Sequence, residues 1–303
     1  MTKRAKAYLC LMTTTIIWGI SPPIIKYTLN FVNPIEFLAI RFIIVCIIIL
    51  PIFIIKLKKQ PFKLKDLPML SLVAICGTTL TLGFLFWGLS LTTSLDAAVL
   101  ASINPLLIVI GGAIFLKEII TKQEKIGLAF AFFGTLIAVV SPLINGSKAL
   151  HSENIIGNLL IFISNLTWVS YSLFSKKFSK KYSSFNITAF SFFIGLITFT
   201  PLLIYQKLSM PEQFFYLPSQ AIPGILYMSL FGSVIAYFTY TYGFSLIEAS
   251  EATLFTYLQP IFTVPLAIIW LKEIVSNSFI VGAIFIVIGV FLTEYRPRKI
   301  FNS

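Results

Sequence analysis

The sequence has few of the side chains on which enzymes and metal sites depend. It contains one histidine, three cysteines and 11 acidic residues among 303. Catalytic and metal sites gather histidine, cysteine and carboxylate side chains into clusters. The single histidine, His151, stands in a polar segment without a cysteine or an acidic cluster beside it. We therefore expect no enzyme, no metal site and no cofactor.

A nucleotide-binding loop and paired cysteines are also missing. The pattern Gly-x4-Gly-Lys-Ser/Thr does not occur, so we do not expect ATP to drive the protein directly. Cys10, Cys46 and Cys76 all lie in apolar segments, where a cysteine behaves as a small hydrophobic residue. The sequence predicts neither disulfides nor reactive thiols.

Charged residues are scarce, at 11% of the chain, whereas 57% of the residues are hydrophobic. An ordinary soluble domain is roughly a quarter charged, so a lipid bilayer is the solvent that this composition fits. The net charge of +12 does not indicate a nucleic-acid partner, because the lysines lie in short segments between apolar runs. We expect membrane lipid and a small-molecule substrate as partners.

Long, continuous apolar runs recur along the chain, without the alternation that is typical of barrel strands. A helix that spans a bilayer needs about 20 mostly apolar residues. Ten such windows can be read from the sequence: residues 7–26, 34–55, 68–89, 97–116, 126–144, 155–174, 187–205, 222–243, 252–271 and 279–295. The prediction is an all-α integral membrane protein with ten transmembrane helices.

The basic residues of the connecting segments indicate how these helices are oriented. With the N-terminus in the cytoplasm, 18 lysines and arginines fall on the cytoplasmic side and four on the other side. Short cytoplasmic loops carry an excess of basic residues. The alternation therefore supports both the helix count and a protein of the plasma (cell inner) membrane with both termini cytoplasmic.

The second half of the sequence repeats the first. A shift of 155 residues aligns matching residues: Gly77 with Gly232, Gly88 with Gly243, Pro105 with Pro260, and Leu-Lys-Glu at 116–118 with Leu-Lys-Glu at 271–273. A shift of 150 residues aligns Trp18 with Trp168. We interpret residues 1–145 and 155–299 as two five-helix repeats.

An odd number of helices in each repeat requires the two repeats to lie in the membrane with opposite orientations. Inverted repeats are a recurrent architecture of secondary transporters, whose substrate site lies near the bilayer midplane between the halves. We therefore expect a central cavity that opens to each side in turn.

Several short motifs resemble the EamA-type branch of the drug/metabolite transporter superfamily. They are Trp18-Gly19 with Lys26, Pro34 with Arg41, the run Trp87-Gly88-Leu89 through Thr93-Ser94, Asn104-Pro105, and the two Leu-Lys-Glu endings. The resemblance implies a cavity lined mainly by helices 1, 3, 4, 6, 8 and 9, and export or exchange of small metabolites such as amino acids, nucleosides, vitamins or drugs. The second repeat departs from the pattern at Ser191, opposite Arg41, and at Val169, opposite Gly19.

Two prolines fall midway along the predicted helices 4 and 9. Pro105 and Pro260 lack an N–H and leave a helical carbonyl without its partner, which within a membrane needs another donor or a wet cavity. Asn104 and Gln259 stand beside them at matching positions. One interpretation is a hinge with substrate contacts at the midplane, and the other is a kink that only improves packing.

Arg41 and two acidic residues are the charges that invite a functional interpretation. A charge deep in the bilayer needs a cavity or a partner. Arg41 is therefore a candidate for binding a substrate carboxylate or for a gating pair with Glu36 or Asp96; the alternatives are a structural ion pair or a side chain that reaches the outer interface. Asp96 and Glu251 occupy equivalent repeat positions at helix starts. They are candidates for gating or proton coupling, or they complement helix dipoles.

Aromatic residues near the middle of helices are candidates for the cavity wall. Tryptophan and tyrosine at helix ends usually belong to the membrane interface, whereas mid-helix rings can stack on a ligand. We expect Trp18, Trp168, Tyr171 and Tyr257 to contact the substrate.

The function that these observations favour is a secondary transporter or exporter of small organic metabolites that works by alternating access. Protons or a counter-substrate are the candidate coupling partners, and the sequence is compatible with a monomer or a homodimer. The alternative is a membrane-embedded lipid-modifying enzyme or a lipid scramblase.

Overall fold

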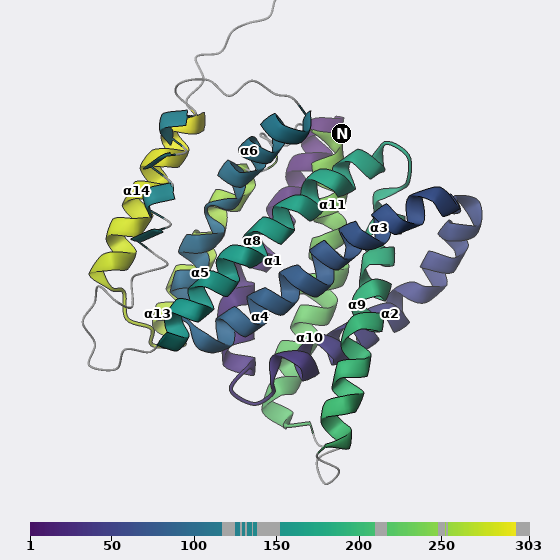
Figure 1. Ribbon diagram of the computed structural model, residues 1–303, viewed down its shortest axis with the longest axis horizontal. Coiled ribbons are helices and arrows are strands. Elements are labelled where there is room, and N and C mark those ends of the chain that lie inside the picture. Colours follow the sequence, from purple (N-terminus) through teal and green to yellow (C-terminus); the bar gives the residue numbers. More distant parts are fainter. Residues whose placement is uncertain are drawn as a thin grey trace, which may run out of the picture.

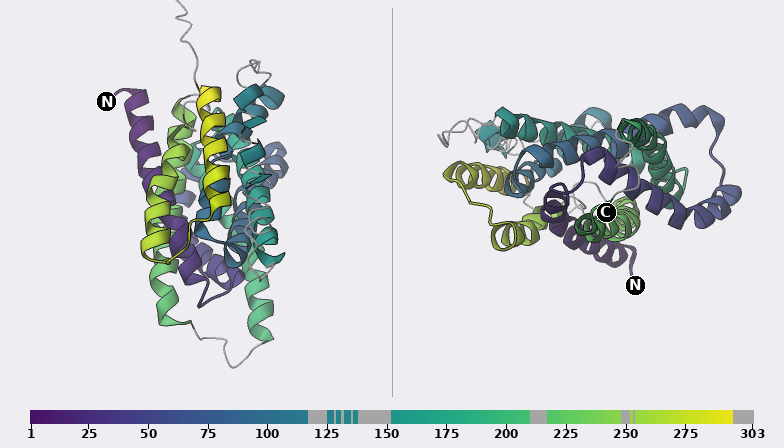
Figure 2. Two further views of the ribbon diagram at one scale, coloured as in Figure 1. Left: turned by 90° about the vertical axis from the view of Figure 1, so that its left-hand side faces the viewer. Right: turned by 90° about the horizontal axis from the view of Figure 1, so that it is seen from below.

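A computed structural model describes most of the chain. The described residues are 1–116, 125–127, 129–130, 132–134, 136–137, 152–209, 217–247, 252 and 254–294. Over these residues the regular structure is helical throughout, without strands, and the helices run side by side in one bundle (Figures 1 and 2). The predicted all-α fold is confirmed for this part of the chain.

The first half begins with two long helices and continues with broken ones. In order these are α1 (Lys3–Thr28), α2 (Pro34–Lys59), η1 (Leu64–Asp66), α3 (Leu67–Ala74), η2 (Ile75–Leu80), α4 (Thr81–Leu91), α5 (Ser94–Ala101) and α6 (Asn104–Leu116). Asn33 and Thr93 each accept a backbone N–H at the start of a helix, as N-cap side chains do.

The second half follows the same plan. Its elements are α8 (Ser152–Ser179), α9 (Ser184–Leu208), η4 (Ser219–Ala221), α10 (Ile222–Ser229), η5 (Leu230–Ile235), α11 (Ala236–Leu246), η6 (Leu254–Leu258), α13 (Gln259–Ile269) and α14 (Asn277–Glu294). Four consecutive elements, η4 to α11, start and end 155 residues after η1 to α4. The sequence offset of the two halves thus recurs in the element boundaries.

Six helical segments are long and apolar enough to span a membrane: Lys3–Thr28, Pro34–Lys59, Leu64–Leu91, Asn154–Ser179, Ser184–Leu208 and Ser219–Leu246. Shorter apolar helices cover Ser94–Ile108, Phe255–Ile269 and Asn277–Gly289. Nine of the predicted windows correspond to these segments. In the window at 126–144, ten of the 19 residues lie outside the described residues.

The predicted helices 4 and 9 are each divided in two. α5 ends at Ala101 and α6 begins at Asn104, while the 3₁₀ turn η6 leads into α13 at Gln259. Pro105 and Pro260 stand second in the new helices, where a missing N–H does no harm. The prolines therefore start new helices instead of kinking continuous ones.

Both halves also contain a π-helical turn within the third membrane-length segment, η2 at Ile75–Leu80 and η5 at Leu230–Ile235. A π turn is an uncommon interruption of an α-helix and is frequent at functional sites. Both turns lie next to the cavity described below.

Helices of one half pack mainly against helices of the other. The most extensive contacts join α4 to α8, α1 to α11, α2 to α9 and α1 to α13. α14 lies at one edge of the bundle and α2 lies at the opposite edge (Figures 1 and 2). Gly88 and Gly157 allow α4 and α8 to approach closely, because a Cβ at Gly88 would lie 2.8 Å from the Gly157 carbonyl oxygen.

The bundle is apolar outside and partly polar inside. Ile47 and Ile55 of α2 and Val287 of α14 are more than half exposed, whereas Thr188 and Ser191 of α9 are buried. An exposed apolar surface of this extent is unfavourable in water and suits lipid. The arrangement is that of a membrane protein.

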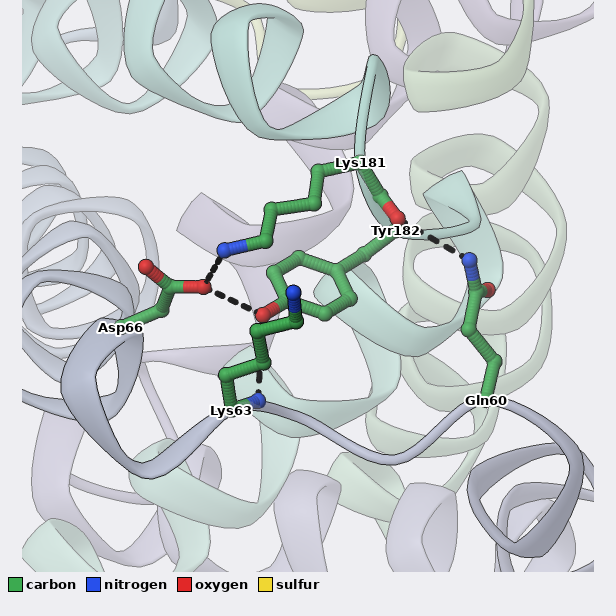
Figure 3. A network of polar contacts seen from close by, with 5 residues as sticks. All are labelled: Gln60, Lys63, Asp66, Lys181 and Tyr182. Carbon is green, nitrogen blue, oxygen red and sulfur yellow. Dashed lines mark hydrogen bonds and ion pairs between the residues drawn. The ribbon is translucent and has the colours of Figure 1, made fainter.

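A polar network joins the connection between α2 and η1 to the connection between α8 and α9 (Figure 3). Asp66 accepts hydrogen bonds from Lys181 and Tyr182, and the Gln60 side chain donates to the Lys181 carbonyl at 3.0 Å. The hydrogen bond to Asp66 raises the pKa of Lys181. This network, the clasp, ties the two halves together at one end of the bundle.

Candidate functional site: the central cavity

A cavity of about 130 Å³ lies between the two halves. Its wall comes from α1, α4, α5, the start of α6, α8, α10, α11, η6 and α13, with Arg41 reaching in from α2. These elements correspond to the six helices that the family resemblance implies, with α2 added. Six of the predicted site residues line it: Trp18, Arg41, Asn104, Trp168, Gln259 and Pro260.

Four aromatic rings form one wall of the cavity. Trp18 and Trp168 meet edge to face with ring centroids 5.1 Å apart, and Tyr240 lies 5.2 Å from Trp18 and 5.0 Å from Trp168. Tyr237 completes the group at 5.2 Å from Trp18. We call Trp18, Trp168, Tyr237 and Tyr240 the aromatic wall.

Sequence reasoning missed Tyr237 and Tyr240. Both stand 155 residues after leucines, Leu82 and Leu85, so the repeat comparison gave no aromatic match. The available signal was their spacing of three residues, which places both rings on one face of a helix. That helix also carries Gly243, which the 155-residue shift aligns with Gly88. The structure shows that the two halves contribute unequally to the wall.

Arg41 is fully buried, and the side chain is held by polar groups of η5. Its Nε donates to the Ser233 hydroxyl at 2.7 Å, and Nη2 donates to the Gly232 carbonyl at 3.5 Å. The guanidinium carbon lies 5.7 Å from the centre of the Phe86 ring. Nη1 has no hydrogen-bond partner among the described residues.

The two acids considered as partners of Arg41 lie elsewhere. Glu36 forms an ion pair with Lys207 at 2.7 Å, and Asp96 accepts from the Thr92 hydroxyl at 3.2 Å. The expectation of an ion pair with Arg41 is therefore wrong for both. The physical reason is that the Gly232 carbonyl and the Ser233 hydroxyl accept from the guanidinium instead.

The two π turns are bound by side chains of the opposite halves. The Gly232 carbonyl in η5 accepts from Trp18 Nε1 at 3.1 Å as well as from Arg41, and the Gly77 carbonyl in η2 accepts from the Tyr237 hydroxyl at 3.2 Å. One carbonyl of each π turn thus receives a donor from the other half. These bonds fix the aromatic wall and Arg41 relative to the helical backbone.

Asn104 is held by Asn165 of α8. Asn104 Nδ2 donates to Asn165 Oδ1 at 3.2 Å, and Asn165 Nδ2 donates to the Leu100 carbonyl at 2.8 Å. The Leu100 carbonyl, near the end of α5, also accepts from the Ile103 N–H at 3.3 Å. Asn165, which sequence reasoning missed, also lines the cavity.

Other predicted site residues do not line the cavity. Tyr171 is fully buried against η2, and Tyr257, Pro105 and Asp96 are absent from the wall in this conformation. Asp96 lies in the first turn of α5, where its backbone N–H donates to the Thr93 N-cap. Glu251 lies outside the described residues.

Glu273 caps a helix of the other half. Its carboxylate accepts from the Ser94 N–H at 2.9 Å, the Ser94 hydroxyl at 2.8 Å and the Leu95 N–H at 2.9 Å. An acid at a helix N-terminus is favourable for both hydrogen bonding and the helix dipole. The contact joins the segment that follows α13 to the start of α5.

A bundle of membrane-length helices around a cavity with polar and aromatic walls is the architecture of a multi-pass membrane protein. The model of the EamA-like transporter family matches residues 5–140 and 155–295. The chain belongs to the EamA-like transporter family.

Curated relatives of similar length agree with this assignment. The uncharacterised transporter YyaM of Bacillus subtilis (strain 168) is 27% identical over 95% of this chain and 93% of its own. A probable terminal-alkyne amino-acid exporter of Streptantibioticus cattleyicolor is 24% identical over 97% and 95%. A solved crystal structure with 18% identity covers 98% of both chains at a TM-score of 0.68, which shows likeness of fold.

Proposed function

We propose that the chain is a secondary transporter that exports small organic metabolites across the cytoplasmic membrane by alternating access. The observation that carries the proposal is the cavity between two halves whose elements match at a constant offset of 155 residues. Two similar halves around one site can adopt two conformations of similar energy, each open to one side.

The proposed topology has ten transmembrane helices in two inverted five-helix repeats, residues 1–145 and 155–299, with both termini in the cytoplasm. The matching boundaries of η1 to α4 and η4 to α11 support a duplication. The 18-to-4 distribution of basic residues supports the opposite orientations.

The proposed substrate contacts are Trp18, Arg41, Asn104, Trp168 and Gln259 of the cavity wall. Tyr171 and Tyr257 lie within three residues of cavity-lining residues in the sequence. We propose that they also contact the substrate when the cavity changes shape. Pro105 and Pro260 mark the helix starts at which α6 and α13 can move against α5 and η6. Asp96 and Glu251 are the proposed gating or proton-coupling residues.

Arg41 favours substrates that carry an anionic group, because a buried guanidinium without a carboxylate partner is compensated by an incoming anion. The name of the Streptantibioticus relative, a probable amino-acid exporter, agrees with this preference. Amino acids are therefore the first substrates to test.

The test is solute flux in liposomes that contain the purified protein. We expect uptake or exchange from a labelled pool of amino acids, nucleosides and vitamins, abolished by Asn104→Ala or Gln259→Ala. Asn186→Ala is the matched control, because Asn186 is buried at the start of α9 and does not line the cavity. Absence of solute flux together with scrambling or chemical turnover of lipid would overturn the proposal.

A further inference from the structure

The surface around the clasp is strongly basic. The two stretches of chain that the clasp joins, residues 56–66 and 176–184, contain nine lysines and a single acidic residue, Asp66. Asp66 is already bound by Lys181 and Tyr182. Eight of the nine lysines are exposed: Lys56, Lys58, Lys59, Lys63, Lys65, Lys177, Lys180 and Lys181. An excess of positive charge therefore remains that no acid in either stretch balances.

The clasp brings lysines of the two halves together. The Gln60 side chain donates to the Lys181 carbonyl at 3.0 Å, and the Lys63 N–H donates to the Tyr182 hydroxyl at 3.1 Å. Lys181 Nζ lies 5.2 Å from the centre of the Tyr182 ring, and the Lys63 side chain extends toward the same ring (Figure 3). Like charges repel at such an exposed site. An anion between the ammonium groups removes this repulsion.

An apolar surface that suits lipid leads directly to these lysines. α2 lies at one edge of the bundle (Figures 1 and 2), and its residues Ile47, Ile52 and Ile55 are half exposed or more. The sequence of α2 changes from isoleucine to lysine at Lys56. Basic residues directly after an apolar membrane helix lie at the depth of the lipid headgroups. The anions within reach of these lysines are therefore those of the bilayer surface.

Leu64 favours a lipid over a soluble anion. It is 84% exposed and stands between Lys63 and Lys65. Beside headgroups, an exposed leucine can enter the boundary of the acyl chains, where apolar burial is favourable. A nucleotide or inorganic phosphate would neutralise the lysines but leave Leu64 in water. A basic surface with an apolar anchor in its middle suits an anionic phospholipid.

We propose that the lysines around the clasp bind headgroups of anionic phospholipids, in the leaflet that is cytoplasmic in the proposed topology. The lysines of this basic surface are Lys58, Lys59, Lys63, Lys65, Lys180 and Lys181. A lipid phosphate there contacts ammonium groups of both halves and reinforces the clasp. Lysine acts as a point charge, so recognition depends on the charge of the headgroup and not on its shape. The inference uses the topology of the proposed function and does not depend on transport.

Thermal unfolding of the purified full-length protein in detergent tests the class of lipid. Added phosphatidylglycerol should raise the melting temperature by about 2 °C or more above its value with phosphatidylcholine. The difference should shrink as salt is added, because exposed charges are screened. Inorganic phosphate at the same ionic strength should not reproduce it. Equal stabilisation by phosphatidylcholine or by inorganic phosphate would overturn the proposal.

Removal of charge from the first half locates the site. The triple variant Lys58→Gln, Lys59→Gln and Lys63→Gln removes three ammonium groups and leaves the ion pair of Asp66 with Lys181 in place. It should lose most of the phosphatidylglycerol effect and melt like the parent protein in phosphatidylcholine.

The matched control is the triple variant Lys3→Gln, Lys6→Gln and Lys125→Gln. It removes the same charge from exposed positions on the same side of the membrane in the proposed topology. This variant should keep the phosphatidylglycerol effect. Equal loss in both triple variants would show only a diffuse attraction between basic segments and an anionic surface, and would contradict a site at the clasp.

Two single variants test the contact with the second half and the choice of a lipid. Lys180→Gln should weaken the phosphatidylglycerol effect, and an unchanged effect would contradict a headgroup that bridges the halves. Leu64→Ser keeps every charge and should weaken the effect as well. An unchanged effect in Leu64→Ser would contradict the preference for a lipid over a soluble anion.

The outcomes separate this inference from the proposed function, because unfolding is measured without a transport assay. Stabilisation by phosphatidylglycerol that the first triple variant loses, without solute flux in liposomes, would support the lipid site and contradict transport. Solute flux together with equal melting temperatures in the two lipids would contradict the lipid site and support transport.

Discussion

At the scale of single residues, Arg41 carries the most information. The sequence predicted that this charge faces a cavity or an acidic partner. In the structure Arg41 is among the residues that line the cavity. The partners could not be predicted, because a π turn has no signature in composition or periodicity. The Gly232 carbonyl and the Ser233 hydroxyl that accept from Arg41 both belong to the π turn η5.

Arg41→Met separates a binding role from a structural one. Removing the guanidinium leaves no buried group orphaned, because Ser233 still donates to the Met228 carbonyl and the Gly232 carbonyl still accepts from Trp18. A buried charge without a counter-ion is destabilising, so replacing it with an apolar side chain should be neutral or stabilising by about 1–2 kcal/mol.

The measurements for Arg41→Met are thermal unfolding in detergent and amino-acid flux in liposomes. We expect an unchanged or higher melting temperature together with loss of flux. A large fall in the melting temperature would mean that Arg41 serves mainly to hold η5.

At the scale of elements, the sequence predicted the membrane helices well and their interruptions poorly. The windows at 34–55 and 187–205 correspond to the unbroken helices α2 and α9, because hydropathy reports burial in lipid. A hydropathy window cannot detect the break between α5 and α6, since both pieces are apolar. Pro105 and Pro260 gave the position of each break but not its form.

The matched glycines of the two π turns offer a test of these elements. A Cβ at Gly77 would lie 2.2 Å from Cδ2 of the buried Tyr171 ring, whereas a Cβ at Gly232 would meet the flexible end of Met228 at 2.6 Å. A ring packed on all sides cannot retreat, so Gly77→Ala should destabilise the protein by about 1–3 kcal/mol.

Gly232→Ala is the internal control for Gly77→Ala. Its free energy of unfolding should lie within about 1 kcal/mol of that of the parent protein. Thermal or denaturant unfolding of the two purified variants compares them directly. Equal destabilisation by both substitutions would contradict the prediction that the packing of Tyr171 against η2 makes Gly77 the more sensitive position.

At the scale of the whole molecule, the duplication was readable from the sequence because glycines and prolines kept one register. The pairing of the halves was not, because it depends on contacts between residues far apart in the sequence. Examples are Asp66 with Lys181 (Figure 3) and Glu273 with Ser94. The aromatic wall escaped prediction for a related reason. Tyr237 and Tyr240 break the symmetry of the repeat, and a comparison of halves finds only what both share.

The central claim is that the two halves are inverted in the membrane, and equivalent positions in η1 and η4 test it most directly. Lys65 and Gln220 stand 155 residues apart, and both are exposed at the start of matching segments. Single cysteines are placed at each position, with Cys10, Cys46 and Cys76 replaced, and treated with a membrane-impermeant maleimide in intact cells. We predict labelling at position 220 in intact cells and at position 65 only after the membrane is opened; labelling of both positions from the same side would contradict the account.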